Sequence, residues 1–174
     1  MKILVIYYSQ SGNTKKVADV IFEMLPSPKL IVKMEEVESL DEFDLIFAGF
    51  PVWQFGVPKP ARPFFSRLTK AHQVALFVTH AMDPDTSNPE LRMMLDGILE
   101  KCRKAGDKAN LAGFFHCRGE LSKETADMLA HSRMPLLERF AGMREETLGH
   151  PDHNDLRLAR TFCQEILNSL KNPE

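Results

Sequence analysis

The 174-residue sequence has few cysteines and no long apolar run. Its three cysteines, Cys102, Cys117 and Cys163, are odd in number and form no CxxC pair, which favours reduced thiols in a reducing compartment. No apolar run approaches the ~20 residues of a membrane span, and the N-terminus lacks a basic segment followed by an apolar one. We therefore expect a cytoplasmic protein without a membrane span.

The sequence also lacks a strong charge of either sign and several common catalytic motifs. The formal net charge is -2, and no basic stripe with interleaved aromatics is present, so a nucleic-acid partner is disfavoured. There is no GxxxxGK[ST] loop, no GxGxxG turn and no GxSxG elbow. His150 and His153 are separated by Pro151 and have no evident third ligand, so we expect no metal site.

What the sequence does contain is an even alternation of apolar runs and helical periodicity. Short runs rich in Val, Ile and Phe predict strands over residues 2–8, 30–34, 45–50, 74–79 and 112–117. The periodic segments between and after them predict helices over residues 13–25, 60–68, 89–104 and 152–170. This alternation indicates an α/β fold, a doubly wound parallel sheet with helices on both faces. The segments after the first, third and fourth strands should then line one crevice.

The length suits a single domain spanning residues 1–174. Residues 118–151 exceed a minimal five-strand unit, and they carry two further helical segments, at 123–131 and 135–140. They have too few apolar residues to form a core of their own. We therefore expect a partly helical elaboration at about 118–151, packed near the last strand.

The most informative segment follows the first strand, where residues 7–14 read Tyr-Tyr-Ser-Gln-Ser-Gly-Asn-Thr. A turn of this composition at the start of a helix points several backbone N–H groups at one spot beside the positive end of the helix dipole. Such a site binds an anion, and phosphate is its usual occupant. A plain strand-to-helix turn capped by Ser and Asn is the alternative.

The same residues resemble the phosphate loop of the flavodoxin family. Residues 48–53, Ala-Gly-Phe-Pro-Val-Trp, resemble the family's second flavin loop, and residues 77–80, Phe-Val-Thr-His, resemble the strand end that starts the third. The resemblance implies a five-stranded parallel sheet in the order 2-1-3-4-5 and FMN as cofactor. It assigns FMN contacts to Ser9, Gln10, Ser11, Gly12, Asn13 and Thr14, to Pro51, Val52, Trp53, Gln54, Phe55 and Gly56, and to Thr79, His80, Ala81, Met82 and Asp83.

Physical chemistry supports these assignments. The isoalloxazine of FMN is a flat apolar ring, and Trp53, the single tryptophan, offers a flat surface for it. Gly56 would permit the peptide flip that many flavodoxins use on reduction. The third loop has no second stacking aromatic, so His80, Met82 or Phe55 covers the other ring face, or that face is open to a partner.

Charge near these loops differs from that of classical, strongly acidic flavodoxins. Residues 51–60 contain Lys59 and no acidic residue, and the third loop contains Asp83 and Asp85, with His80 and Arg92 nearby. Because carboxylates disfavour the anionic reduced flavin, we expect a less negative potential for the second electron. The near-neutral chain also predicts a partner recognised more by shape and apolar contact than by charge.

Three functions are compatible with this reading. The first is an FMN electron carrier between a reductase and an acceptor enzyme, acting as a monomer or weak dimer and having no catalytic residues of its own. The second is an FMN-dependent NAD(P)H:quinone-type oxidoreductase, in which residues 118–151 cover a substrate pocket lined by His116, Arg118 and Glu120. The third is a flavodoxin-like module that binds a partner and has lost FMN.

Overall fold

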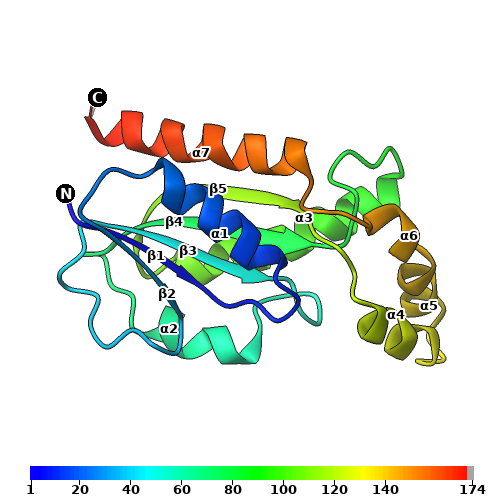
Figure 1. The fold of residues 1–174 in the computed structure, drawn as a ribbon. Coiled ribbons are helices and arrows are strands. Elements are labelled where there is room, and N and C mark those ends of the chain that lie inside the picture. Colours follow the sequence, from blue (N-terminus) through cyan, green and yellow to red (C-terminus); the bar gives the residue numbers. More distant parts are fainter. Residues whose placement is uncertain (172–174) are drawn as a thin grey trace.

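A parallel five-stranded sheet organises the computed structural model, which describes residues 1–171 (Figure 1). The strand order is β2-β1-β3-β4-β5, as predicted. Each strand lies within one residue of its expected position at both ends, except β5, which begins two residues earlier than expected. The strands are β1 (Ile3–Tyr7), β2 (Lys29–Lys33), β3 (Leu45–Pro51), β4 (Gln73–His80) and β5 (Asn110–Arg118).

Helices cover both faces of the sheet (Figure 1). Helices α1 (Asn13–Met24) and α7 (His153–Lys171) pack on one face, and α2 (Arg62–Ser66) and α3 (Pro89–Arg103) lie on the other. Alternate residues of the central strands enter the two cores, so Phe47 packs towards α7 while Ile46 packs towards α2 and α3. Burial on both faces explains why these strands read as continuous apolar runs.

The helix expected at residues 60–68 is the main local difference from the sequence prediction. A 3₁₀ turn, η1 (Lys59–Ala61), precedes the short α2, and both carry proline near their first position. Proline lacks an N–H group and is tolerated only in the first turn of a helix, so Pro60 and Pro63 each open a new short segment.

The last helix begins where the sequence indicated. The Asp155 N–H donates to Asp152 Oδ1 at 2.9 Å, and the Asp152 N–H donates to Asp155 Oδ2 at 2.9 Å. These reciprocal bonds form a capping box and satisfy donors that the first turn leaves free. His150 Nδ1 also contacts Asp155 Oδ2, at 2.5 Å, so this polar cluster is explained by the start of the helix.

Residues 119–150 form a helical segment beyond the carboxyl ends of the strands, and we call it the cap (Figure 1). It contains α4 (Lys123–Ala130), α5 (Pro135–Gly142) and the single turn α6 (Arg144–Thr147), while the 3₁₀ turn η2 (Lys104–Gly106) lies before β5. No residue of α5 is buried. Among residues 1–171, no helix is both long and apolar enough to cross a membrane.

Candidate flavin site

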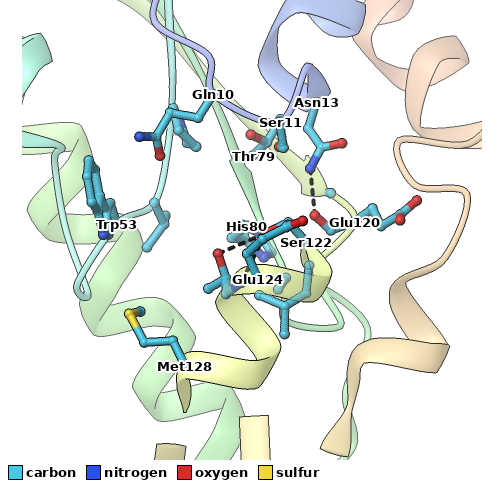
Figure 2. A pocket seen from close by; sticks show the side chains of 16 residues that line it. Gln10, Ser11, Asn13, Trp53, Thr79, His80, Glu120, Ser122, Glu124 and Met128 are labelled. Carbon is cyan, nitrogen blue, oxygen red and sulfur yellow. Dashed lines mark hydrogen bonds between the residues drawn. The ribbon is translucent and has the colours of Figure 1, made fainter. Parts of the chain in front are cut away.

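A cavity of about 490 Å³ opens at the carboxyl ends of the strands (Figure 2). This volume lies within the ~300–1,000 Å³ typical of small-molecule sites. The segments after β1, β3 and β4 meet there, as expected for a doubly wound sheet. Its walls are Gln10, Ser11 and Asn13; Pro51, Val52 and Trp53; Thr79, His80 and Ala81; and Gly119, Glu120, Leu121, Ser122, Glu124, Thr125 and Met128 from the cap.

One end of the cavity carries unpaired backbone donors. Gly12 is the N-cap of α1 and has φ 91°, a left-handed conformation that glycine adopts without strain. Within residues 1–171, no atom accepts a hydrogen bond from the backbone N–H groups of residues 10–14; the next one, of Lys15, donates to Ser9 Oγ at 3.4 Å. These free N–H groups at a helix N-terminus suit an anion such as phosphate.

Two side chains expected to donate to that anion are held by the protein itself. Thr14 Oγ1 lies 2.8 Å from Thr79 Oγ1, which ties the first loop to the end of β4. Asn13 Nδ2 donates to the Glu120 carbonyl oxygen at 2.8 Å, which ties the same loop to the cap (Figure 2). The backbone donors, rather than these two side chains, are therefore the main free groups of the loop.

Trp53 forms the opposite wall, and its side chain is 39% exposed (Figure 2). Its position is fixed by a tight hairpin, because the Trp53 N–H donates to the Gly56 carbonyl at 3.0 Å and the Gly56 N–H donates back at 3.2 Å. The two central residues, Gln54 and Phe55, have φ of 50° and 61°. Such angles match a type I′ hairpin turn and are strained for side chains of this size.

Comparison with known proteins identifies the family of this chain. A family model described as a flavodoxin domain matches residues 4–164. The chain belongs to the flavodoxin family. It is 26% identical to the flavodoxin-like domain-containing protein BilS of Clostridioides difficile, over 96% of this chain and 97% of that protein.

Solved structures agree on the fold. The flavodoxin of Streptococcus pneumonia TIGR4 superposes with a TM-score of 0.61 at 12% identity, over 97% of this chain and 99% of that one. A flavodoxin from the domain Archaea gives a TM-score of 0.57 at 19% identity, over 99% of this chain and the whole of the other.

In this flavodoxin, the left-handed residues of the second loop are Gln54 and Phe55. The peptide flip expected at Gly56 stays a prediction. Together with Gly56, Gln54 and Phe55 line a second, separate cavity and not the main one. Hairpin geometry sets the backbone here, because two residues between paired positions both need positive φ whatever their side chains.

Of the three side chains considered for the second ring face, only His80 lines the main cavity. Met82 is buried in the core on the α2 and α3 face, and Phe55 packs near Phe140 of α5, with ring centroids 6.2 Å apart. His80 lines the cavity but is itself buried. The cap instead brings Met128 to the cavity wall with its side chain 61% exposed (Figure 2).

His80 forms a buried pair with His116 of β5. His80 Nε2 lies 3.0 Å from His116 Nδ1. Burial and the neighbouring His116 ring lower the pKa of His80 to about 3, and burial lowers the pKa of His116 against the opposing effect of Asp96. Both imidazoles are therefore neutral near pH 7. One of the two facing nitrogens carries a proton and donates it in the hydrogen bond to the other.

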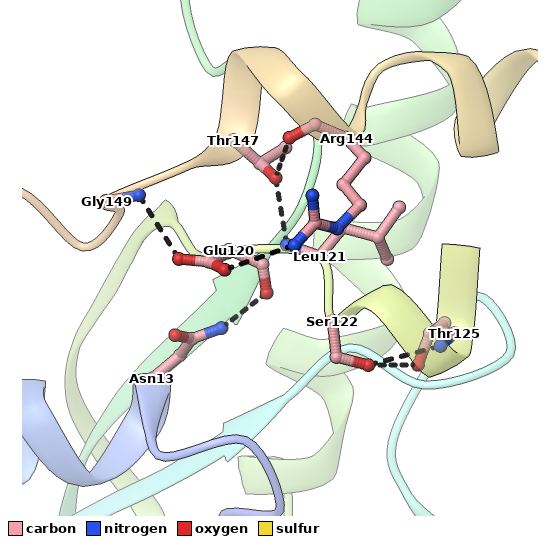
Figure 3. A network of polar contacts seen from close by, with 8 residues as sticks. All are labelled: Asn13, Glu120, Leu121, Ser122, Thr125, Arg144, Thr147 and Gly149. Carbon is pink, nitrogen blue, oxygen red and sulfur yellow. Dashed lines mark hydrogen bonds and ion pairs between the residues drawn. The ribbon is translucent and has the colours of Figure 1, made fainter. Parts of the chain in front are cut away.

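The charge around the cavity comes partly from the cap. The sequence-based expectation considered only the charged residues of the second and third loops and left the cap out. Glu120 is paired with Arg144 at 3.8 Å and accepts a hydrogen bond from the Gly149 N–H (Figure 3). Glu124 lies exposed at the cavity wall without an ion pair in the described chain. Asp83 accepts from the Asp85 N–H in a local turn. Glu124 is thus the main uncompensated carboxylate at the site.

Sequence reasoning missed Leu121, Ser122, Glu124, Thr125 and Met128 as lining residues. Their local structure was readable, because Ser122 Oγ accepts from the Thr125 N–H at 3.2 Å as a helix N-cap. Their position was not, since it depends on contacts to distant residues. Leu121 N–H donates to Thr147 Oγ1 at 2.9 Å, and this bond closes the base of the cap (Figure 3).

The three cysteines take no part in the site. All are free and buried, and burial raises the pKa of the Cys102 thiol to about 12 and that of Cys163 to about 11. The pKa of Cys117, at the end of β5, is raised as well, chiefly by burial. Thiols of this kind are unreactive at neutral pH.

Proposed function

We propose that this flavodoxin binds FMN in the main cavity and carries electrons between a reductase and an acceptor enzyme. One observation carries the proposal. Unpaired backbone N–H groups of residues 10–14 stand at one end of a 490 Å³ cavity, and the flat side of Trp53 stands at its wall. A phosphate and a planar apolar ring joined by a short chain need this pair of surfaces.

The residues present fit FMN in their chemistry. The N–H groups of residues 10–14 would hold the phosphate, and the hydroxyl of Ser11 adds a donor at the cavity wall. Trp53 would stack on the ring, with Met128 from the cap near it. When bound, FMN supplies reversible transfer of one or two electrons, and the protein sets its binding and electronics.

The contacts around the cavity would keep this geometry fixed during a reaction cycle. The bond between Thr14 and Thr79 fixes the phosphate loop against the sheet, and the bond from Asn13 to Glu120 fixes it against the cap. The hairpin of residues 53–56 fixes the stacking surface. A rigid site with small structural change is what a carrier requires, because reorganisation slows electron transfer between proteins.

The oxidoreductase reading has one observation in its favour. Seven of the sixteen residues that line the cavity come from the cap, including Ser122, Glu124 and Thr125. These polar groups would contact a small substrate placed over the ring. A carrier needs no such polar wall, so the second function, an FMN-dependent NAD(P)H:quinone-type reductase, is retained. The buried free cysteines support a reducing compartment such as the cytoplasm for either function.

A steady-state assay separates the carrier from the reductase. It measures oxidation of NADH and NADPH by the FMN-loaded protein with a soluble quinone as acceptor. The proposal expects a rate near background for the protein alone. It expects a large increase when a flavoprotein reductase is added, because electrons then reach the flavin through a partner. Rapid oxidation of NADH or NADPH by the protein alone would contradict the carrier function and favour the reductase.

A further inference from the structure

The corner of the molecule beside Trp53 is basic, although the whole chain is weakly acidic. Residues 45–82 contain no Asp or Glu. They do contain Lys and Arg. Two of these basic residues lie at the carboxyl end of the sheet, Lys59 in η1 and Arg62 at the start of α2. This local charge differs in sign from the net charge of -2.

A second cavity, of about 480 Å³, lies at this corner. Phe55, Val57, Phe65 and Ala105 give it apolar walls, and two cations complete it, Arg62 and Lys101. Neither cation forms an ion pair with any carboxylate of residues 1–171. Arg62 is held in place by a hydrogen bond from its Nε to the Val57 carbonyl at 3.3 Å, which leaves its terminal nitrogens available.

Phe55 is exposed there at a structural cost. Its side chain is 38% exposed, and its backbone has a φ of 61°. A non-glycine residue in this conformation costs about 1–2 kcal/mol, and an exposed phenyl ring gains little from burial in the isolated protein. Strain that displays an aromatic side chain next to a cofactor site is characteristic of a functional surface.

The apolar surface continues from Phe55 towards the main cavity. Trp53 is two residues away, and it lines the main cavity together with Met128 (Figure 2). Exposed large apolar residues also extend along the cap, at Met134 and Leu136. An apolar centre with aromatic anchors, bordered by Arg and Lys, has the composition of a protein-protein interface.

We propose that this face, made by residues 53–62, Lys101 and Met128, docks a redox partner protein whose contact surface carries Asp and Glu around an apolar side chain. The proposal deepens the carrier function and rests on it. Its basis is charge complementarity: a partner's apolar side chain enters the second cavity while its carboxylates pair with Arg62 and Lys101. This changes the expectation from the near-neutral total charge, because the local charge is polarised.

The opposite sign on the cap would orient the partner. Glu124 lies exposed on α4, on the other side of the main cavity from the Trp53 hairpin (Figure 2). A partner with an acidic face is repelled there and attracted to the hairpin corner. Its redox centre is then brought beside Trp53, where the ring edge of bound FMN would lie.

Cytochrome c provides a matched pair of probes for the test. The native haem protein is basic, and succinylation converts its lysines to carboxylates while the haem is retained. One electron passes from the reduced flavoprotein to the Fe(III) haem, giving Fe(II). The proposal expects a faster bimolecular rate with the succinylated form at low salt, and a rate that falls as salt rises.

Lys101→Glu is the primary variant, because no hydrogen bond or ion pair of Lys101 has to be broken in the described structure. It should slow electron transfer to succinylated cytochrome c by about tenfold at low salt, an effect of the size produced by electrostatic steering. Arg62→Glu should act in the same direction. Lys108→Glu makes the same charge change at the amino end of β5 and should leave the rate within twofold of the unchanged protein.

A binding measurement separates failure of the docking face from failure of the carrier function. Succinylated Fe(II) cytochrome c needs no flavin to bind, and it should shift the amide resonances of residues 53–62 and 101–105. Shifts confined to other residues, or tighter binding of native cytochrome c, would overturn the docking face even if FMN binds normally. A protein that binds no FMN but shows the expected shifts would instead overturn the carrier function.

Discussion

Asn13 Nδ2 donates a hydrogen bond of 2.8 Å to the carbonyl oxygen of Glu120, a residue 107 positions later in the chain. Asn13 is the first residue of α1, and Glu120 is the second residue of the cap. Gly119 makes this approach possible, because a Cβ there would lie 2.9 Å from Asn13 Nδ2. The start of α1 and the cap are therefore held together as one unit.

Asn13→Ala tests this unit. Losing one hydrogen bond of this kind costs about 1 kcal/mol, so FMN affinity measured by calorimetry should fall by roughly fivefold to tenfold. Amide hydrogen exchange at residues 120–125 should become faster as well. Asn154→Ala removes an exposed amide at the start of α7 and should change neither quantity. Unaltered affinity and unaltered exchange in Asn13→Ala would show that the bond is dispensable.

Trp53 is the only tryptophan, so its own fluorescence reports on the stacking surface. Titration with FMN should quench this emission in proportion to site occupancy. Trp53→Ala should weaken FMN binding by about tenfold, since aromatic stacking contributes ~0.5–1.5 kcal/mol beyond the area that it buries. Trp53→Phe keeps a flat ring and should retain most of the affinity. Tryptophan emission that ignores saturating FMN would place the flavin elsewhere.

Glu124 should tune the flavin potential. Two-electron-reduced FMN is an anion, and a nearby carboxylate raises its free energy, so Glu124→Gln should make the potential of the second electron less negative by tens of millivolts. Asp127→Asn on the same helix is the control, because Asp127 does not line the cavity. Spectroelectrochemical titration measures both. An equal shift in the two variants would exclude a local effect of Glu124.

The His80–His116 pair should make stability depend on pH. The pKa of His80 is lowered to about 3 in the folded protein and lies near 6.5 in the unfolded chain. Below pH 6.5 the unfolded chain therefore binds a proton that the folded protein does not. The free energy of unfolding should therefore keep its maximum contribution from this pair above pH 6.5. It should fall at lower pH, by up to about 1.4 kcal/mol per pH unit for each such histidine.

Urea unfolding between pH 5.5 and 7.5 measures this slope, in a range where ordinary carboxylates stay ionised. His80→Gln should flatten the slope, because the buried titrating group is gone. His153→Gln alters an exposed histidine and should leave the slope unchanged. A slope equal in all three proteins would mean that the pair is protonated in the folded state.

The fold and the turn that precedes α1 could be predicted from the sequence because their signals are local. Continuous apolar strands such as residues 45–50 and the turn before Asn13 depend on neighbouring residues alone. The cap could not be placed, since its position rests on long-range contacts such as Asn13 with Glu120. The strained hairpin was also hidden, because Gln54 and Phe55 carry no sequence preference for positive φ, whereas Gly56, which does, was given the role instead.

Anaerobic, stepwise reduction of the FMN-loaded protein, followed by its absorbance, addresses the proposed carrier function as a whole. We predict one FMN per chain and electron uptake in two separate steps with distinct spectra, because a one-electron carrier must hold the flavin at an intermediate level of reduction. Uptake of both electrons in a single step, or a protein that leaves added FMN free in solution, would contradict it.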